Sequence, residues 1–520
     1  MPMTVSRSTP FALAATALAA TLCGCAAVGP DYAGAPPVAV DAVQAPRFVR
    51  DAAASASAPA SAPMPVAASA QASSASSAST STSTSTSDSA SRADAAAGAA
   101  SASNAPWWHE LDDATLDGLV EQALTGSPTL QAAQARLRAA RAAFNQQEAK
   151  RRPTGSAAAL GLGLWQAPGT DQESSAHLYS LGFDASWELD LFGGSRRAVE
   201  AASAQAQAVR ADLADAQVSL AAEVAQAYVA LRAQQCRLAL LRDTATQDAQ
   251  ALALMRQRRE RGVSTADEVE QRVAQGESTQ AAAADVAAQL SASLDRLALL
   301  TGQAPGALDT VLGTAAPRLP ALPRALRVGD PATLLQRRPD IRAAERRLAA
   351  SSAQIGQQTA GYFPKISLLG DIGFAGTSLG KLLNGDSLAL IAVPYLSWNV
   401  LDFGRTATAV RQAEAGRDEA LANYQAAVLG ALQDANTALA RYGQQRQVLQ
   451  RRLAQQASAG RSAELAQQRR QAGVASQLDL LDARRADIDA RLQALEGEAD
   501  LLKDFVALQK SLGLSWAAQG

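Results

Sequence analysis

The sequence is poor in the side chains from which catalytic and metal sites are built. Its 520 residues contain two histidines, His109 and His177, and three cysteines. No G-x-S-x-G motif, Cys/His pair or glycine-rich phosphate loop after a strand is found. Three cysteines also exclude a disulfide framework. We therefore expect no enzyme activity, no metal site and no cofactor.

Aromatic and charged residues are scarce as well. Aromatics make up 4% of the chain, charged residues 18%, and the net charge is −2. Nucleic-acid binding depends on clustered Lys and Arg, so the lack of a basic cluster excludes nucleic acid as a partner. Alanine is abundant, which favours long helices with thin side chains over a bulky globular core.

The first residues form a processing signal. An apolar run, "FALAATALAATL", precedes "LCGC" at 22–25, the pattern of a bacterial lipoprotein signal. We expect residues 1–24 to be removed and Cys25 to carry the lipid; the alternative is an ordinary signal peptide with an accidental cysteine. Ala26 is not the aspartate that retains lipoproteins at the inner membrane. Cys236 would then be a lone thiol, most simply a small helix residue.

Residues 25–105 are expected to link the lipid to the folded part of the chain. Within them, 51–104 is an Ala/Ser/Thr-rich stretch with almost no large apolar residue. Such a segment cannot bury enough apolar surface to fold. We therefore predict a tether that ends at "PWWHELDD".

Two parts of the chain have nearly the same sequence. "WELDLFGG" at 187–194 returns as "WNVLDFGR" at 398–405, an offset of 211 residues, and the same offset relates Pro128 to Pro339 and Pro153 to Pro364. The match predicts a tandem structural repeat, with repeat 1 at 106–302 and repeat 2 at 338–516. Residues 303–337 form a Pro-rich segment between them.

Each repeat contains one very long helix. Residues 195–261 contain neither Pro nor Gly, so they can form a single helix of about 100 Å. Gly262-Val263 then predicts a turn, and we expect a helical hairpin over 195–300. Its counterpart spans 405–512, with the turn at Gly473-Val474. Helices of this length must pack against one another as extended coiled-coil hairpins.

Each repeat also contains a predicted β-hairpin, at 154–192 and 364–403. Residues 179–191 alternate strictly between apolar and polar, and Leu160, Leu162 and Leu164 alternate before them. A strand of this length can cross a bilayer when tilted, with Trp187 and Trp398 at the interface. The alternative is a soluble two-sided sheet.

Four strands cannot close a barrel, and an open sheet edge cannot face lipid. The pattern therefore predicts an oligomer. A dimer would give eight strands with a filled interior, and a trimer would give twelve strands with room for a channel.

Several motifs carry a resemblance to a known family. They are "GCAAVGPDY", "SWELDLFG", "LLQRRPDIRAAERRLAASSAQIG", "YFPKISL" and "GVASQLDLLDARR", and the resemblance covers about residues 106–516. The chain resembles the TolC-like outer-membrane factors of tripartite efflux systems, in particular their NodT-type lipoprotein branch. The Ser/Thr-rich insertion at 51–104 departs from that pattern.

The resemblance implies an α+β membrane protein. Three chains would build a 12-stranded transmembrane β-barrel, with four strands from each chain, continuous with a long periplasmic α-helical barrel and an equatorial belt around 303–337. The homotrimer would be an exit duct in the outer membrane, where lipid surrounds it. Its partners would be a periplasmic adaptor and an inner-membrane efflux pump, with multidrug resistance as the outcome. The alternatives are a lipid-anchored coiled-coil scaffold or a duct for type I protein secretion.

The resemblance also implies functional sites. The turns Gly262-Val263 and Gly473-Val474 would be the periplasmic tips that meet the adaptor. Asp479 and Asp482 are three residues apart and share a helix face, with Arg485 one turn further on.

At a threefold axis, Asp479 and Asp482 would form two carboxylate rings, raise some carboxylate pKa values and hold the periplasmic gate closed. The first copy has Glu268 and Glu270 nearby rather than a matching pair. The alternative is a solvated helix face whose carboxylates pair with Arg485.

Overall fold

The computed structural model describes residues 27–50, 106–164, 176–313, 317–323, 328, 330–332, 337–382 and 384–513. The chain divides into two compact units. The first consists of 1–38, 132–213 and 339–429, and the second of 39–131, 214–338 and 430–520. Each unit therefore takes segments from both repeats. Cys25 and the low-complexity stretch 51–104 lie outside the described residues.

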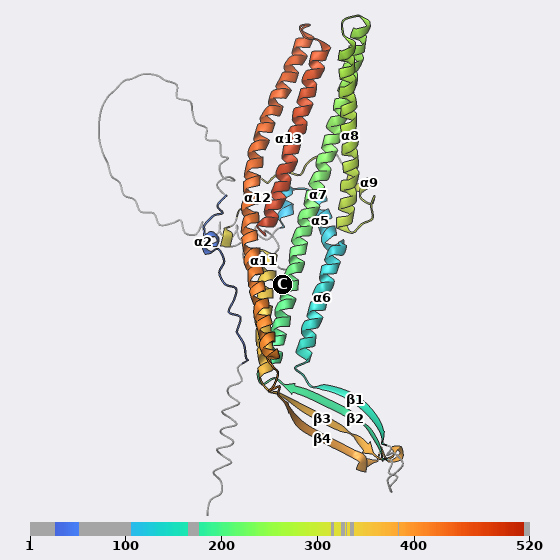
Figure 1. The fold of residues 1–520 in the computed structure, drawn as a ribbon. Coiled ribbons are helices and arrows are strands. Elements are labelled where there is room, and N and C mark those ends of the chain that lie inside the picture. The colour runs from blue at the N-terminus through green and yellow to red at the C-terminus, as the bar shows by residue number, and fades with distance from the viewer. Residues whose placement is uncertain are drawn as a thin grey trace, which may run out of the picture. The chain divides into compact units, whose positions relative to one another are not determined.

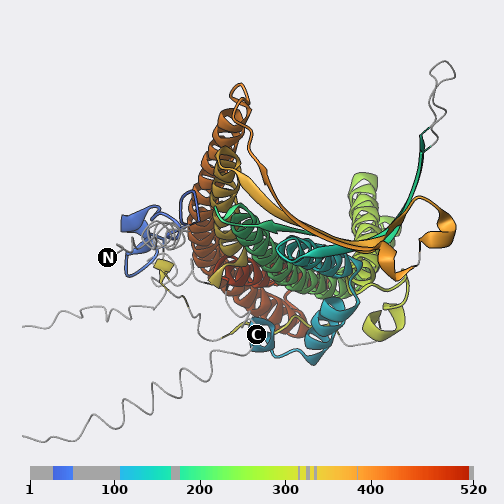
Figure 2. The same ribbon diagram turned by 90° about the horizontal axis from the view of Figure 1, so that it is seen from below.

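The first unit contains one antiparallel sheet in the order β1-β2-β3-β4 (Figure 1). The strands are β1 (Thr154–Leu164), β2 (Ala176–Leu189), β3 (Lys365–Gly376) and β4 (Leu388–Ser397). Figure 2 shows that the sheet is strongly curved. The two hairpins have the same register: Thr154 pairs with Ser186 in the first, and Lys365 with Ser397 in the second.

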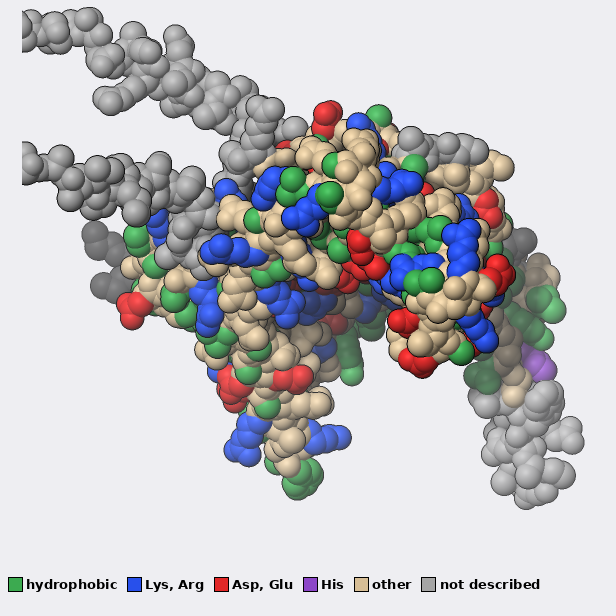
Figure 3. All heavy atoms as spheres, turned by 90° about the horizontal axis from the view of Figure 1, so that it is seen from above, with side chains coloured by type: hydrophobic (Ala, Val, Ile, Leu, Met, Phe, Trp, Pro, Cys, Tyr) green, Lys and Arg blue, Asp and Glu red, His purple; other side chains and the backbone are tan. Residues whose placement is uncertain are grey.

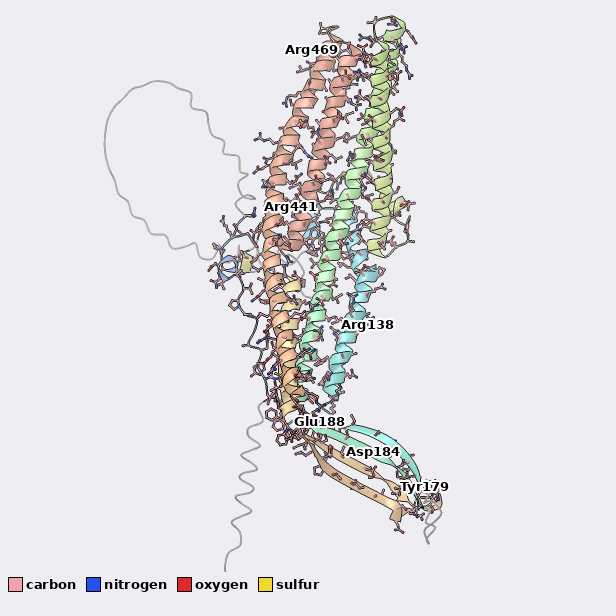
Figure 4. The ribbon with its side chains drawn as sticks, in the orientation of Figure 1. Arg138, Tyr179, Asp184, Glu188, Arg441 and Arg469 are labelled. Carbon is pink, nitrogen blue, oxygen red and sulfur yellow. The ribbon has the colours of Figure 1, made fainter. Side chains whose placement is uncertain are left out.

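The register divides the side chains between two faces of the sheet. Phe183 lies opposite Ile372, and Trp187 opposite Leu368, on what we call the apolar face. Asp184 lies opposite Asp371 on the other, the polar face. Figure 4 labels Asp184 with Tyr179 and Glu188 along β2. The alternating leucines of β1 lie on the polar face, because Leu160 is opposite Ser180.

In each repeat, the Trp-to-Gly motif connects the end of the β-hairpin to the start of the long helix. The indole of Trp187 donates a hydrogen bond to the Arg151 carbonyl (2.9 Å), and that of Trp398 donates to the Tyr362 carbonyl (3.0 Å). These two bonds are related by the 211-residue offset. Each indole therefore ties the end of one strand to the residues that lead into its hairpin.

An aspartate then starts each long helix. Asp190 accepts hydrogen bonds from the backbone N–H groups of Ser195 and Arg196, and Asp402 accepts from those of Gly404 and Thr406. The two aspartates are one position out of step in the repeat, but both accept from the same repeat position, Ser195 in the first copy and Thr406 in the second. A carboxylate here satisfies N–H groups that have no partner within the helix. The glycine between, Gly193 or Gly404, has a positive φ.

The predicted long helices are present as α7 (Gly194–Glu260) and α12 (Arg405–Gln471). In the second unit, α8 (Ala266–Thr301) runs back beside α7, and α13 (Gln477–Ser511) beside α12 (Figure 1). The other helices in the described part of the chain are α2 (Val40–Val43), η2 (Trp107–Leu111), α5 (Ala114–Gly126), α6 (Pro128–Ala149), α9 (Asp309–Gly313), α11 (Pro339–Thr359), η3 (Ala360–Tyr362), η4 (Leu379–Lys381) and η5 (Gly385–Ser387). Within the described ranges, no helix combines the length and apolar character that membrane crossing requires.

A buried polar network fixes α5 against α7 in the second unit. Asp113 caps α5 by accepting from the N–H groups of Thr115 and Leu116. Its carboxylate also accepts a hydrogen bond from the Tyr228 hydroxyl (2.8 Å), which in turn accepts from Nε of Arg232 (2.9 Å). Tyr228 is fully buried, and desolvation raises the pKa of its hydroxyl. A buried hydroxyl with both partners present orients the helices it joins.

Candidate gate, hairpin tips and anchor

Both hairpin tips have the same backbone geometry. Gly262 and Gly473 have φ values of 73° and 75°. The N–H of Val263 donates to the Arg258 carbonyl (2.8 Å), and that of Val474 to the Arg469 carbonyl (2.9 Å). This pattern is a Schellman motif, which needs a left-handed residue and therefore favours glycine. The sequence predicted these turns from the same glycines.

The tips present basic and apolar side chains to solvent. Val263 is 63% exposed and Val474 74% exposed. The last turns before them carry Arg258, Arg259, Arg469 and Arg470. Figure 3, seen from above, shows Lys and Arg side chains at this end of the second unit, and Figure 4 labels Arg469 there.

Asp479 caps a helix. Its carboxylate accepts a hydrogen bond from the Ser476 N–H (2.8 Å), and its own N–H donates to the Ser476 hydroxyl (3.2 Å). Thr265 and Glu268 form the same capping box at the start of α8. The backbone hydrogen bond from Ser476 lowers the pKa of Asp479. Within one subunit this shift is opposite to the raised carboxylate pKa expected for a gate ring.

Asp482 joins the two hairpins. Its carboxylate accepts two hydrogen bonds from the Arg272 guanidinium on α8, at 2.7 and 2.9 Å. The arginine side chain is 21% exposed and the aspartate 48%. The hydrogen bond that Arg272 donates to Asp482 raises the pKa of Arg272 above its ordinary value. A bidentate pair of this kind fixes direction as well as distance.

Arg485 makes a second connection, to the buried Asp248 on α7. Asp248 is 7% exposed and accepts hydrogen bonds from Arg485 and from the Thr279 hydroxyl (2.7 Å). Arg485 also lies 4.0 Å from Asp489, one turn further along α13. We call Asp248, Arg272, Thr279, Asp482 and Arg485 the hairpin cross-link. It ties α13 of repeat 2 to α7 and α8 of repeat 1.

The sequence therefore identified two of the five residues of this cluster. Asp482 and Arg485 belong to it, whereas Asp479 does not contact it. Sequence reasoning missed Asp248, Arg272 and Thr279, because their role depends on the packing of one hairpin against the other. One difference between the repeats could have drawn attention to Arg272. The corresponding residue in repeat 2 is Ala483, so the arginine is specific to repeat 1.

The residues that follow Cys25 pack against the sheet end of the first unit. The N–H of Val28 donates to the Phe192 carbonyl (3.1 Å), and Ala27 lies against Gly193. Arg197 on α7 is 6% exposed and donates to Asp31 (2.5 Å) and to the carbonyls of Val28 and Gly29. The segment from Ala27 to Tyr32 is thus held beside the strand-to-helix exit.

These features define a protein with paired long helical hairpins and a four-stranded sheet, and comparison with known proteins identifies the class. The family model for outer membrane efflux protein matches residues 119–303 and 331–514. The chain therefore belongs to the outer membrane efflux protein family.

Two curated relatives support this assignment. Outer membrane protein OprJ of Pseudomonas aeruginosa is 31% identical over 414 residues, covering 79% of this chain and 86% of the relative. The solvent efflux pump outer membrane protein SrpC of Pseudomonas putida is 30% identical over 412 residues, covering 78% and 86%.

A solved structure agrees in fold. The outer-membrane channel OprN superposes with a TM-score of 0.73 at 38% identity, covering 79% of this chain and 92% of that chain. The fold predicted from the sequence is confirmed: the chain is one subunit of a trimeric channel that combines a β-barrel with a helical barrel. Its function as an outer-membrane exit duct for efflux is confirmed as well.

Proposed function

We propose that the chain forms a lipid-anchored homotrimer that receives small molecules from a periplasmic adaptor and an inner-membrane pump. We further propose that the hairpin cross-link holds the resting duct closed. The observation that supports this gate is the pair of ion pairs between the hairpins, Arg272 to Asp482 and Arg485 to Asp248. An opening of the helical end requires the hairpins to separate, and both ion pairs oppose that separation.

The two ion pairs can hold the hairpins together at rest and can be broken when the duct opens. Arg272 and Asp482 are partly exposed, so their pairing contributes only about 0–1 kcal/mol. Asp248 is buried and has two donors, so losing Arg485 would leave a poorly compensated charge. Adaptor binding that separates the hairpins therefore has one weak and one stronger contact to break. Asp479 is proposed as a second carboxylate ring only in the trimer, since it caps its own helix within one chain.

Small molecules are the proposed cargo. The relatives SrpC and TtgI of Pseudomonas putida are named for the efflux of solvent and of toluene. These names favour a small-molecule duct over a duct for type I protein secretion. Membership in a channel family leaves the coiled-coil scaffold without support.

Lipid anchoring at Cys25 is supported by the packing of the residues after it. Ala27 and Val28, the second and third residues after Cys25, lie against Gly193 and Phe192 just beyond β2. A Cys25→Ser variant should lose acyl labelling and still insert, because the barrel itself holds the trimer in the bilayer. Wild-type protein that carries no lipid would contradict this assignment.

Adaptor docking at Gly262-Val263 and Gly473-Val474 is supported by the geometry of the tips. The two turns share one backbone conformation and expose a valine beside basic residues. A trimer would present six such turns, and six partner tips with acidic and apolar side chains would fit them.

Cysteines at the cross-link provide the test. Arg272→Cys and Asp482→Cys are combined in a Cys236→Ser background and joined with a reversible bis-thiosulfonate reagent. The matched control joins Gln467→Cys to Arg484→Cys, whose side chains meet within one hairpin (3.0 Å). We expect drug efflux to stop in the first variant, to return on reduction, and to continue in the control. Undiminished efflux in the locked first variant would refute the gate.

A further inference from the structure

The sheet has two outer strands, β1 and β4, each paired on one side within the described residues. We propose that β4 of one copy pairs with β1 of the next copy in a fixed antiparallel register, with Tyr395 opposite Leu160 and Val393 opposite Leu162. The inference rests on the trimer of the proposed function and assigns the residues that meet at its seams. Strand edges cannot remain open in the hydrocarbon region, so each must find a partner.

The repeat supplies the register. Both hairpins keep the same pairing when every number is raised by 211, so the strands of repeat 2 are true counterparts of those in repeat 1. Repeats 1 and 2 meet at the β2–β3 boundary, where Asp184 lies opposite Asp371. At a seam between copies, β4 replaces β2 and β1 replaces β3. The same operation therefore brings Tyr395 opposite Leu160 of the neighbouring copy.

Apolar side chains on the polar face support this register independently. Large apolar residues on that face lie on the outer strands β1 and β4 and at the positions of β2 and β3 that pair with them. Those near β1 are Leu160, Leu162 and Leu178, and those near β4 are Leu369, Ile391, Val393 and Tyr395. These apolar side chains would be unfavourable on a surface that faces water. At a seam between copies, each of them contacts an apolar neighbour on the adjacent strand.

The proposed register joins these residues into one row across four strands. Leu178 is opposite Leu162 in one copy, and Val393 is opposite Leu369 in the other. Pairing Leu162 with Val393 completes the row. A slip of one residue would turn the β1 leucines away from the β4 apolar side chains, and a slip of two residues would break the row.

The apolar face is complementary in size at the same seam. On β1 this face carries only small residues, among them Ala159 and Gly161, whereas β4 carries Pro394 and Leu396. The register places Leu396 opposite Ala159 and Pro394 opposite Gly161. Large side chains therefore lie beside small ones, as close packing of two strands requires.

The same operation extends the seam beyond the strands. Phe192 stacks on Phe363, with ring centroids 4.7 Å apart, at the boundary between the repeats. Its counterpart Phe403 is 95% exposed in the single chain. At the seam its partner position is Arg152 of the neighbouring copy. A guanidinium over an aromatic ring is a favourable cation–π contact.

Disulfide trapping of the full-length trimer tests the register. In a Cys236→Ser background that keeps Cys25, one variant carries Leu160→Cys with Tyr395→Cys, and another carries Ala159→Cys with Leu396→Cys. The two pairs point to opposite faces, so one of them occupies the closer type of antiparallel pair. We expect oxidation to convert the trimer to covalently linked dimers and trimers on a non-reducing gel. A Phe403→Ala variant should dissociate at a lower temperature than Phe403→Trp.

Shifted and internal pairs are the controls. Leu162→Cys with Tyr395→Cys is two residues out of register and should cross-link at least tenfold less. Asp184→Cys with Asp371→Cys is the equivalent pair within one chain and should oxidise fully. Equal or stronger cross-linking of the shifted pair overturns the register. So does an intact trimer that leaves both matched pairs reduced while the internal pair oxidises. Efflux is measured separately: a correctly cross-linked trimer without efflux would refute the proposed function and leave the register standing.

Discussion

The carboxylate of Asp482 on α13 receives both arms of the Arg272 guanidinium on α8, at 2.7 and 2.9 Å. The two residues lie on different repeats, 210 positions apart. Because each repeat contributes its own helical hairpin, this pair makes the position of one hairpin depend on the other. A change at either residue should therefore alter the duct without unfolding either hairpin.

Removal of Arg272 should raise the resting conductance. An Arg272→Ala variant loses both hydrogen bonds to Asp482, and we expect several-fold higher conductance in planar bilayers and increased entry of a large antibiotic such as vancomycin. The matched control is Arg296→Ala on the same helix, whose pair with Glu223 is well exposed at 3.4 Å. Stability should change by no more than about 1 kcal/mol in both variants. Equal conductance of Arg272→Ala and wild type would place the gate elsewhere.

The tips should tolerate a change of side chain better than a change of backbone. Any residue larger than glycine at 473 is strained by the positive φ, so a Gly473→Trp variant mixes strain with steric effects. Val474→Glu leaves the turn intact and places a negative charge on the exposed tip. We expect weaker cross-linking to the adaptor and lower efflux at unchanged trimer yield. Val448→Glu, an exposed valine in the middle of α12, is the control; a loss of efflux there as well would count against tip docking.

Arg197 should hold the residues after the lipid anchor. Replacing it with alanine removes the donors to Asp31 and to the carbonyls of Val28 and Gly29. Losing a buried charge-assisted contact costs about 2 kcal/mol locally. We expect proteolysis after Tyr32 to become at least tenfold faster in the native trimer. Arg196→Ala, an exposed neighbour, should cleave like wild type; equal rates in all three proteins would show that Arg197 does not fix this segment.

Loss of the Tyr228 hydroxyl should destabilise the second unit. A Tyr228→Phe variant leaves the buried Asp113 carboxylate without one donor and the Arg232 guanidinium without one acceptor. We expect a loss of about 1–3 kcal/mol, measured as a lower denaturant midpoint of the purified trimer. Tyr442→Phe is the comparison, because that buried tyrosine lies outside the network around Asp113. A smaller loss at Tyr228 than at Tyr442 would contradict the role given to this network.

The N-terminal end of α12 should become less stable in acid. Hydrogen bonds from Thr406 and from the Gly404 N–H lower the pKa of Asp402 from 3.8 to about 2. A depressed pKa means that the contribution of Asp402 to stability is complete above pH 3.8 and is lost as pH falls through about 2. Asp402→Asn still accepts hydrogen bonds but does not titrate. Melting temperatures between pH 5 and pH 2 should fall less steeply in that variant than in wild type, and parallel curves would refute the assignment.

The long helices were predictable because their limits are set by local chemistry. The stretch without Pro or Gly from residue 195 to 261 is observed as Gly194–Glu260, and the glycine turns occupy the expected positions. Alternation likewise located the strands, since one apolar face repeats every second residue. Both signals lie within a few residues of the structure that they specify.

Features that depend on distant packing were not predictable. Asp248 and Arg272 lie on repeat 1, and only the packing of α13 against α7 and α8 shows what they bind. The register likewise reveals that Leu160 and Leu162 lie on the polar face, which alternation alone does not determine. The family resemblance and the spacing predict a gate role for Asp479, while the capping box gives it a local role. Its place in a trimeric ring stays a prediction.

The hairpin tips also bear on the order in which the molecule forms. Only five residues separate the two helices at each tip, 261–265 and 472–476. The first contacts in each hairpin therefore close a short loop. Pairing of the outer strands β1 and β4 instead requires another chain, so its rate depends on protein concentration. Short loops close within about 0.1 µs, and subunit assembly takes milliseconds to minutes. We therefore expect the helical hairpins to exist in monomers that have no finished sheet, and the rate of channel formation to rise with protein concentration.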